Sequence, residues 1–539
     1  MGRVRRFLTR LEPAATVADL GAMVLFACGV IADLNTLHRT FGVFDEALIS
    51  LNASLINGGA VPCRDFYSNY PPGLFYLVGL LFRVFGENVL VTRFFGLVVH
   101  LALALLAGRV AGQLRGRRFA WMPAGLMMLW LAQLELTPFA YLTGLCWALG
   151  AIALFQRARD RGTRGAWLLT GACVGIGSFF RHDLFLFLAV VLTVVAATWW
   201  ALFHRKRFEA THARALGWFV LGAATLELVL WGPLFARAGA QPIYDLALDQ
   251  IRHVQPGRLL PVPWLLAMTE PHGPWSVKSA LPAMFHEQLE GAMLFVFVGP
   301  FAFAAALLAA RRLGLDRPIV CTVGALALAT LPQTLGRTDM HHAIYGIVAP
   351  VILLWCLAEA LAAKLPKPAL LLPMVPVLIF LSYPARSAIT MRVRITPVEP
   401  LMQNPRGKGA IGFEIRDELV QAIQSRTQPG EPIFVGLTDH RRTVANELDL
   451  YWLSERPGST RYLQFDPNLT NREDVQEQMI RELEMKGTRL LVLSKKYTDR
   501  EEPNQSAIYR SALLDAYFAL NFHRVQQLNE TYSIWMRNP

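Results

Sequence analysis

Two adjacent carboxylates, Asp45 and Glu46, open the loop that follows the first apolar stretch of the chain. The same loop continues to Arg64 and Asp65 and ends in a Tyr-Pro-Pro-Gly segment at residues 70–73. Charged side chains are costly beside lipid, so a carboxylate pair at the mouth of a membrane-spanning segment indicates chemistry rather than packing. A carboxylate can accept a proton as a general base, and nearby cations can hold an anionic group.

The composition is that of a membrane protein, so transmembrane helices must position these charged groups. Of the 539 residues, 54% are apolar and 17% are charged, which is outside the range of a soluble domain. The apolar residues form blocks of about 18–25, and we predict about eleven transmembrane helices, the first an uncleaved anchor. The predicted spans lie near residues 17–37, 88–112, 119–134, 137–156, 165–180, 184–203, 214–236, 291–310, 318–335, 343–363 and 369–384.

The net charge of +12 is a topology signal rather than a mark of nucleic-acid binding. Basic residues are concentrated in every second short loop, at residues 3–6, 115–118, 157–164, 204–207, 311–317 and 364–367. This positive-inside pattern predicts that the N-terminus and these loops are cytoplasmic, with a contribution from anionic lipid heads. Of the six cysteines only Cys63 lies well outside the apolar spans, so neither a disulfide framework nor a zinc motif is predicted.

The remaining loops face outward and contain most of the other polar clusters. The clusters comprise Arg181 and His182 in the turn after the fifth span, Arg252 and His253 in the loop after the seventh, and Arg337, His341 and His342 in the turn after the ninth. Their convergence on one face predicts a single site built from loops on a helical scaffold. The apolar segment 73–86 is only about fourteen residues long, so we expect it to lie in or re-enter the outer interface.

Two domains are expected. We expect residues 1–390 to form a mainly α, polytopic membrane domain that contains the catalytic residues, with the acidic pair in its outer loop 38–87. Residues 391–539 form a small extracytoplasmic α/β domain, since an odd number of spans places this end outside. Its strands are predicted at residues 433–437, 490–494 and 532–536, and its helices at 411–426, 471–486 and 506–521.

These features resemble the GT-C superfamily of membrane glycosyltransferases, most closely the family 39 branch of protein O-mannosyltransferases and aminoarabinose lipid A transferases. The resemblance is carried by Asp45 and Glu46, by the stretch from Arg64 to Gly73, and by the order of the spans. It implies transfer of a hexose or pentose, with inversion, from a polyprenyl-phosphate-linked donor to a lipid, glycan or protein acceptor outside. Because nucleotide sugars are confined to the cytoplasm, an outward-facing transferase needs such a lipid-linked donor. The implied location is the bacterial inner membrane.

The resemblance, together with position, makes Asp45 our expected general base. Glu46 would orient the acceptor or hold Asp45 through a shared cation, although the pair could simply cap a helix beginning near Ala47. Asp65 is the competing carboxylate, but it could pair with Arg64 or be solvated. Tyr70 could bond a phosphate or a sugar hydroxyl, or it could anchor the chain at the interface.

The leaving phosphate needs cations, for which Arg337 is the strongest candidate because guanidinium groups bind phosphate in a fork. The other candidates for binding donor or substrate are Arg64, Asp65, Tyr70, Arg181, His182, Arg252, His253, His341 and His342. Each cation could instead meet lipid heads or snorkel to the interface. The sequence identifies no cofactor, and it leaves open whether a divalent cation (Mg²⁺ or Mn²⁺) is needed, because an Asp-Glu pair is not a dedicated metal cage.

A different class of protein also fits the outward charged loops. A secondary transporter or a flippase of a lipid-linked sugar would use them as a substrate path, although such proteins generally show internal repeats, and none is detected here. A ligase with an undecaprenyl diphosphate donor would share the phosphate site. The sequence leaves the sugar and the acceptor open.

Overall fold

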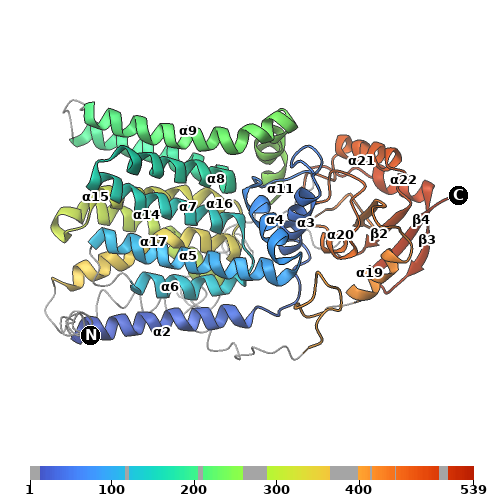
Figure 1. The fold of residues 1–539 in the computed structure, drawn as a ribbon, viewed down its shortest axis with the longest axis horizontal. Helices are drawn as coiled ribbons and strands as arrows, with labels where there is room; N and C mark the ends of the chain where they lie inside the picture. The colour runs from blue at the N-terminus through green and yellow to red at the C-terminus, as the bar shows by residue number, and fades with distance from the viewer. Residues whose placement is uncertain are drawn as a thin grey trace, which may run out of the picture.

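The computed structural model describes residues 13–115, 121–203, 210–258, 288–364, 399–412, 415–443, 445–496 and 508–539. Long helices run side by side through one half of the molecule, and a smaller domain with a sheet lies at one end of them (Figure 1). The chain enters through α2 at the end of the helical half remote from the sheet, and it finishes in the sheet domain.

The helical half has the composition of a multi-pass membrane protein. Its helices are α2 (Pro13–Asn35), α5 (Val89–Arg115), α6 (Trp121–Leu131), α7 (Ala140–Arg161), α8 (Arg164–Phe203), α9 (Ala210–Ala238), α14 (Gln288–Leu313), α15 (Arg317–Ala329), α16 (Leu331–Gly336) and α17 (Met340–Ala362). In the described part of the chain, 6 helical segments are long and apolar enough to cross a bilayer. This supports a polytopic protein but not a count of eleven spans, and the predicted span 369–384 lies outside the described residues.

Helix α8 contains a break at Arg181, whose φ of −154° and ψ of 81° are not helical. The two halves of α8 correspond to the predicted spans 165–180 and 184–203. A Cβ on Gly177 would lie 2.1 Å from the ring of Phe185, a contact across the break that a straight helix would not allow. The predicted turn therefore exists, and it brings Arg181 to the end of the helices that faces the sheet domain.

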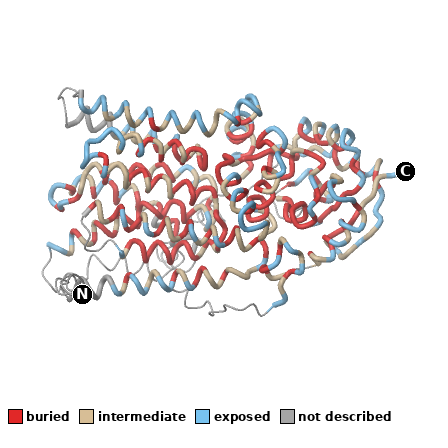
Figure 2. Tube along the Cα trace, viewed as in Figure 1, coloured by how far each residue is buried: buried red, intermediate tan, exposed pale blue. Residues whose placement is uncertain are grey.

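Helices α8 and α9 pack so closely that their backbones are in contact at glycine residues. A Cβ on Gly171 would lie 1.9 Å from the carbonyl oxygen of Phe219, and one on Gly222 would lie 2.2 Å from that of Leu168. Small residues allow this close approach between membrane helices. Buried residues fill the middle of the helical half, while α9 is largely exposed (Figure 2), as expected for a helix that faces lipid.

The basic helix ends lie together, far from the sheet domain. Arg159, near the end of α7, pairs with Asp316 at 2.9 Å, and the amide of Asp316 donates to the carbonyl of Leu114 near the end of α5. Lys364, after α17, donates to the carbonyl of Arg312 at the end of α14. The basic loops that were predicted to be cytoplasmic therefore lie at one end of the long axis of the molecule. Which side of the membrane this end faces stays a prediction.

Two shorter helices, α3 (Asp45–Asn57) and α4 (Gly73–Phe85), lie between the bundle and the sheet domain (Figure 1). Helix α4 covers nearly the whole predicted segment 73–86 and is too short to count among the candidate spans. Its buried face, which includes Val78, packs against α3, whereas Leu80, Val84 and Phe85 are exposed. An exposed apolar face of this kind suits the outer interface, which remains the predicted location.

The C-terminal domain contains a four-stranded mixed sheet. In chain order its elements are α19 (Arg416–Gln424), β1 (Ile433–Leu437), α20 (Asp449–Ser454), α21 (Glu473–Met485), β2 (Leu490–Ser494), α22 (Leu513–Asn521), β3 (Phe522–Gln527) and β4 (Tyr532–Arg537). The strand order is β1-β2-β4-β3, with β1 parallel to β2 and the other pairs antiparallel. The three predicted strands are confirmed, whereas β3 was not predicted because this exposed edge strand is mostly polar.

Candidate functional site

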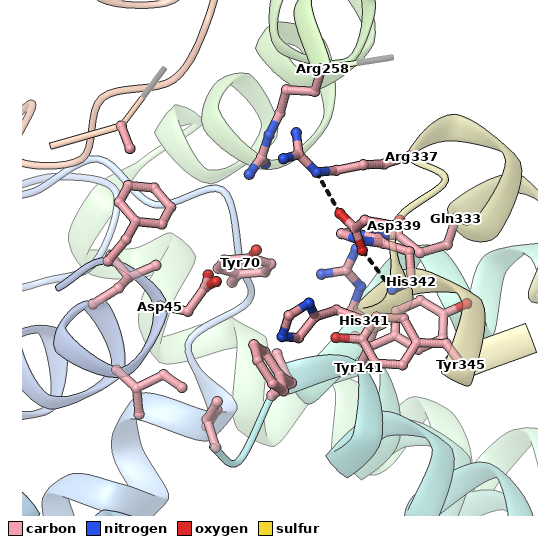
Figure 3. A pocket seen from close by; sticks show the side chains of 18 of the residues that line it. Asp45, Tyr70, Tyr141, Arg258, Gln333, Arg337, Asp339, His341, His342 and Tyr345 are labelled. Atoms are coloured by element: carbon pink, nitrogen blue, oxygen red, sulfur yellow. Dashed lines mark hydrogen bonds and ion pairs between the residues drawn. The ribbon is translucent and has the colours of Figure 1, made fainter. Parts of the chain in front are cut away.

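A cavity of about 310 Å³ lies where the helical half meets the C-terminal domain. Its polar lining comes from segments far apart in the sequence (Figure 3). The polar residues are Asp45, Tyr70, Tyr141, Arg181, Arg258, Gln333, Arg337, Asp339, His341, His342 and Tyr345. The structure therefore brings Asp45, Tyr70, Arg181, Arg337, His341 and His342 together, as the sequence predicted for a single outer site.

Asp45 is the first residue of α3, and its side chain is exposed to the cavity. Its carboxylate lies beside the hydroxyl of Tyr70 (Figure 3). It forms no hydrogen bond or ion pair with any residue that the structure describes. A carboxylate without a protein partner is available to accept a proton from a bound molecule.

Glu46 does not line the cavity. Its carboxylate accepts hydrogen bonds from Arg93 Nε at 2.7 Å and from the amide of Gly42 at 2.9 Å. Burial alone would raise the pKa of Glu46, but the charges of Arg93 and Arg39 hold that pKa below its ordinary value. Helix α3 begins at Asp45, after Phe44, which makes no side-chain cap. Glu46 thus ties the start of α3 to the preceding loop.

Arg181 lies between two aromatic rings. Its guanidinium carbon is 5.3 Å from the ring centroid of Tyr70 and 5.0 Å from that of Tyr141. It also pairs with Asp183 at 2.8 Å and donates to the side-chain oxygen of Gln333 at 3.2 Å. A Cβ on Gly144 would lie 2.7 Å from Arg181 Cβ, so the glycine leaves room for this position.

Arg337 and His342 share one carboxylate. Asp339 accepts from Arg337 Nε at 2.8 Å and lies 2.7 Å from His342 Nδ1. It also caps α17 by accepting from the amide of His342 at 3.0 Å. Burial works to raise the pKa of Asp339, but bonding to His342 and the charge of Arg337 lower it well below its ordinary value. The carboxylate therefore remains ionised and fixes the turn that carries Arg337.

Arg258 was not predicted as a site residue. It ends α11 (Gln255–Arg258), which follows two π-helical turns, η3 (Tyr244–Leu248) and η4 (Gln250–Val254). Burial opposes its charge, but Asp466, 3.4 Å away, outweighs burial and raises the pKa of Arg258. The Arg258 and Arg337 side chains converge at one side of the cavity (Figure 3). The sequence signal was a further cation in the same predicted loop, five residues after the more conspicuous Arg252-His253 pair.

The other predicted site residues lie outside the cavity. Arg64 and Asp65 pair with each other on the surface at 2.8 Å. His182 packs against Trp231, with ring centroids 6.5 Å apart. Arg252 is exposed. His253 shares a hydrogen bond of 3.2 Å with Tyr509 of the C-terminal domain. Among the described residues, no group of three or more His, Cys, Asp or Glu side chains could hold a metal ion.

The wall of the cavity nearest Asp45 is apolar. Its lining residues come chiefly from α3, α4 and the segment that leads into α7, namely Phe44, Leu48, Ile49, Leu74, Phe75, Phe139 and Ala140. Three guanidinium groups therefore share a cavity with an apolar wall. This arrangement suits a ligand that carries an anionic group on a hydrocarbon chain.

No protein-family model matches this sequence, and no curated protein matches it either. Solved structures do match. ArnT from Cupriavidus metallidurans bound to undecaprenyl phosphate superposes with a TM-score of 0.55 at 14% identity, over 96% of this chain and 97% of that chain. Its apo state gives a TM-score of 0.54 at 15% identity, over 96% and 98%.

A second match is the Archaeoglobus fulgidus oligosaccharyltransferase tethered with an acceptor peptide that contains the NVT sequon. It gives a TM-score of 0.52 at 12% identity, over 95% of this chain and 74% of that chain. At such low identity these matches establish the fold alone. The fold that the resemblance implied is therefore shared with these solved structures.

Proposed function

We propose that this protein is a membrane glycosyltransferase that moves a sugar from a polyprenyl-phosphate-linked donor to an acceptor outside the cytoplasm. One observation carries the proposal. The carboxylate of Asp45, which pairs with none of the described residues, shares a cavity with the guanidinium groups of Arg181, Arg258 and Arg337. A general base and a set of phosphate-binding cations are the two requirements of sugar transfer from a lipid phosphate.

The reaction follows from this arrangement. The acceptor hydroxyl attacks the anomeric carbon of the donor sugar from the face opposite the phosphate, and Asp45 takes the hydroxyl proton. The bond between the anomeric carbon and the phosphate oxygen breaks, and the polyprenyl phosphate leaves with the bonding electrons. Inversion at the anomeric carbon results because attack and departure occur on opposite faces.

The phosphate would be held by Arg258 and Arg337. Each uses Nε toward a carboxylate, Arg258 toward Asp466 and Arg337 toward Asp339, so each can turn its remaining N–H groups to the donor. These groups stabilise the negative charge that grows on the departing phosphate. Arg181, fixed between two rings, adds a third cation.

Tyr70 would donate a hydrogen bond to the donor. Burial and the nearby Asp45 charge raise the pKa of Tyr70, so its hydroxyl stays protonated at neutral pH. A protonated phenol beside the base can hold a sugar hydroxyl or a phosphate oxygen. Glu46, which lies behind the cavity, would position α3 rather than touch the substrate.

The isoprenoid chain would follow the apolar wall formed by α3 and α4. The fold shared with ArnT, which was solved with undecaprenyl phosphate bound, supports a lipid-linked donor. We further propose that the basic loops face the cytoplasm and that the C-terminal domain, beginning near residue 391, lies outside the bacterial inner membrane.

The test uses the purified full-length protein in lipid nanodiscs with radiolabelled polyprenyl-phosphate hexoses and pentoses. Transfer predicts release of polyprenyl phosphate and labelling of a membrane acceptor, both dependent on Asp45. In sealed vesicles, movement of the intact donor across the bilayer at the same rate in wild type and Asp45→Asn would instead identify a flippase.

A further inference from the structure

The C-terminal domain is attached along the loop that leads to Arg258. Arg461 contacts Asp245 at 2.5 Å and donates to the carbonyl of Cys63 at 2.7 Å. Arg472 pairs with Asp249 at 3.2 Å. Asp245 and Asp249 lie on successive turns of the segment 244–254, so the C-terminal domain contacts this segment at more than one turn.

Gly257, the residue before Arg258, packs directly against the C-terminal domain. A Cβ on Gly257 would lie 2.9 Å from the side-chain nitrogen of Asn468 and 3.0 Å from the carbonyl oxygen of Pro467. A larger residue at position 257 would require the Asn468 side chain or the Pro467 backbone to shift. The residue that follows is Arg258, so its position is set by the surface of the domain.

Asp466 faces Arg258 from this surface. Its side chain is buried, with 1% exposed, and Oδ1 lies 3.4 Å from Arg258 Nε. The other oxygen, Oδ2, accepts from Gln464 at 2.5 Å and from Asn69 at 3.5 Å. One carboxylate thus joins the domain, the outer loop next to Tyr70, and the cation at the cavity.

We infer that Asp466 is a positioning residue, which fixes the Arg258 guanidinium toward the cavity so that the C-terminal domain completes the phosphate-binding half of the site. This inference rests on the proposed function. A buried carboxylate that orients a guanidinium leaves its remaining N–H groups directed at the ligand. Such pre-organisation matters most as charge develops in the transition state, so loss of Asp466 should lower kcat more than it changes the KM of the acceptor.

The experiment combines a mutant cycle with hydrogen exchange on the full-length protein. Asp466→Asn and Arg258→Gln are made singly and together, with Asp439→Asn as a matched control. Asp439 belongs to the same domain and pairs with Arg441, but it does not line the cavity. The assay measures kcat and both KM values, and mass spectrometry follows amide exchange in residues 241–258 and in β1.

We expect Asp466→Asn to lower kcat by about tenfold to a hundredfold, with the acceptor KM unchanged and Asp439→Asn equal to wild type. In the Arg258→Gln background, Asp466→Asn should cause no further loss, because the two residues act as one unit. Exchange should accelerate in residues 241–258 while β1 stays protected.

Independent, multiplying losses in the double variant, or faster exchange throughout β1, would mean that Asp466 only stabilises the domain and would overturn the inference. An unchanged kcat in Asp466→Asn would overturn it as well. If the wild type transfers no sugar from any donor, the proposed function fails. In that case the exchange of residues 241–258 still decides whether Asp466 fixes Arg258.

Discussion

Glu46 and Arg93 form a two-pronged ion pair in the interior, with Nε to Oε1 at 2.7 Å and Nη2 to Oε2 at 3.0 Å. The same guanidinium donates to the carbonyl oxygens of Leu37, Arg39 and Thr40. Arg93 therefore joins α5, the start of α3 and the loop that leaves α2. Successive residues of a helix point in different directions, so holding Glu46 inside turns Asp45 toward the cavity.

Glu46→Gln should destabilise the protein without removing the proposed base. Breaking a buried ion pair leaves an uncompensated charge, here on Arg93, and costs about 3–5 kcal/mol. Thermal unfolding of the detergent-purified variant should show a clear drop in Tm, while turnover per folded molecule falls far less. Asp45→Asn is the matched control, because its side chain has no described protein partner, and its Tm should equal that of the wild type. Equal stability of the two variants would contradict the prediction.

Asp45→Asn should remove most sugar transfer. An amide cannot take the acceptor proton, and loss of a general base lowers the rate by about 10² to 10⁴. Donor binding should persist, because the guanidinium groups are untouched, so a lipid-phosphate binding assay would separate the two effects. Asp65→Asn tests the competing carboxylate. Asp65 pairs with Arg64 on the surface, and its loss should leave turnover unchanged. The reverse result, an active Asp45→Asn and an inactive Asp65→Asn, would reassign the base.

Arg337→Gln should raise the donor KM and lower kcat, each by about tenfold or more, because it removes a cation from the leaving phosphate. Arg337→Lys should restore little, since an ammonium group cannot both bond Asp339 in the same geometry and offer a fork to the phosphate. The acceptor KM should not change in either variant. The control is Arg252→Gln, an exposed arginine outside the cavity, which should behave as wild type.

The sequence predicted what depends on local pattern and on charge. Apolar blocks located the helices, basic loops located one end of the bundle, and short apolar runs located three of the four strands. The edge strand β3 escaped because only Phe522 within it is buried. This strand forms because it pairs with β4, which begins ten residues later, and its own sequence has no apolar pattern that would predict it.

The roles inside the site depended on partners remote in the sequence. Asp45 and Glu46 are chemically similar and adjacent, and the partners of Glu46 distinguish them, above all Arg93 in the next long helix. Arg258 enters the cavity because π-helical turns and Asp466, more than two hundred residues later, direct it there. No local pattern encodes such contacts, whereas the clustering of the polar loops at one end of the bundle was predictable from the alternation of basic and other loops.

The close packing of α8 on α9 can be tested with a pair of glycines. Gly171→Ala would place a methyl group 1.9 Å from the carbonyl oxygen of Phe219, so the helices must separate, at a cost of about 1–3 kcal/mol. Gly217→Ala on α9 meets no atom within 4 Å and should be neutral or slightly stabilising, because alanine is the better helix former. Thermal unfolding in detergent distinguishes the two. Equal Tm values would show that the α8–α9 contact contributes little to stability.

The C-terminal domain should lose stability as the pH rises through neutrality. Arg416 lies 3.0 Å from both Asp449 and Glu447, so two buried carboxylates share one guanidinium. Burial raises the pKa of Asp449 to about 7, although Arg416 opposes the shift, and the charge of Glu447 adds to it. In the unfolded chain an aspartate has a pKa of about 4.

The sign of the effect follows from these two values. Between pH 4 and pH 7 the folded domain binds a proton that the unfolded chain does not, so this stabilisation is complete at low pH and is lost as pH rises through 7. The opening free energy should fall by about 1 kcal/mol between pH 6 and pH 8. Amide exchange of β1 and β2 in the full-length protein, corrected for the intrinsic rate, measures it. Asp449→Asn should flatten the profile, and a wild-type profile as flat as that of the variant would show that Asp449 is ionised throughout and would contradict the prediction.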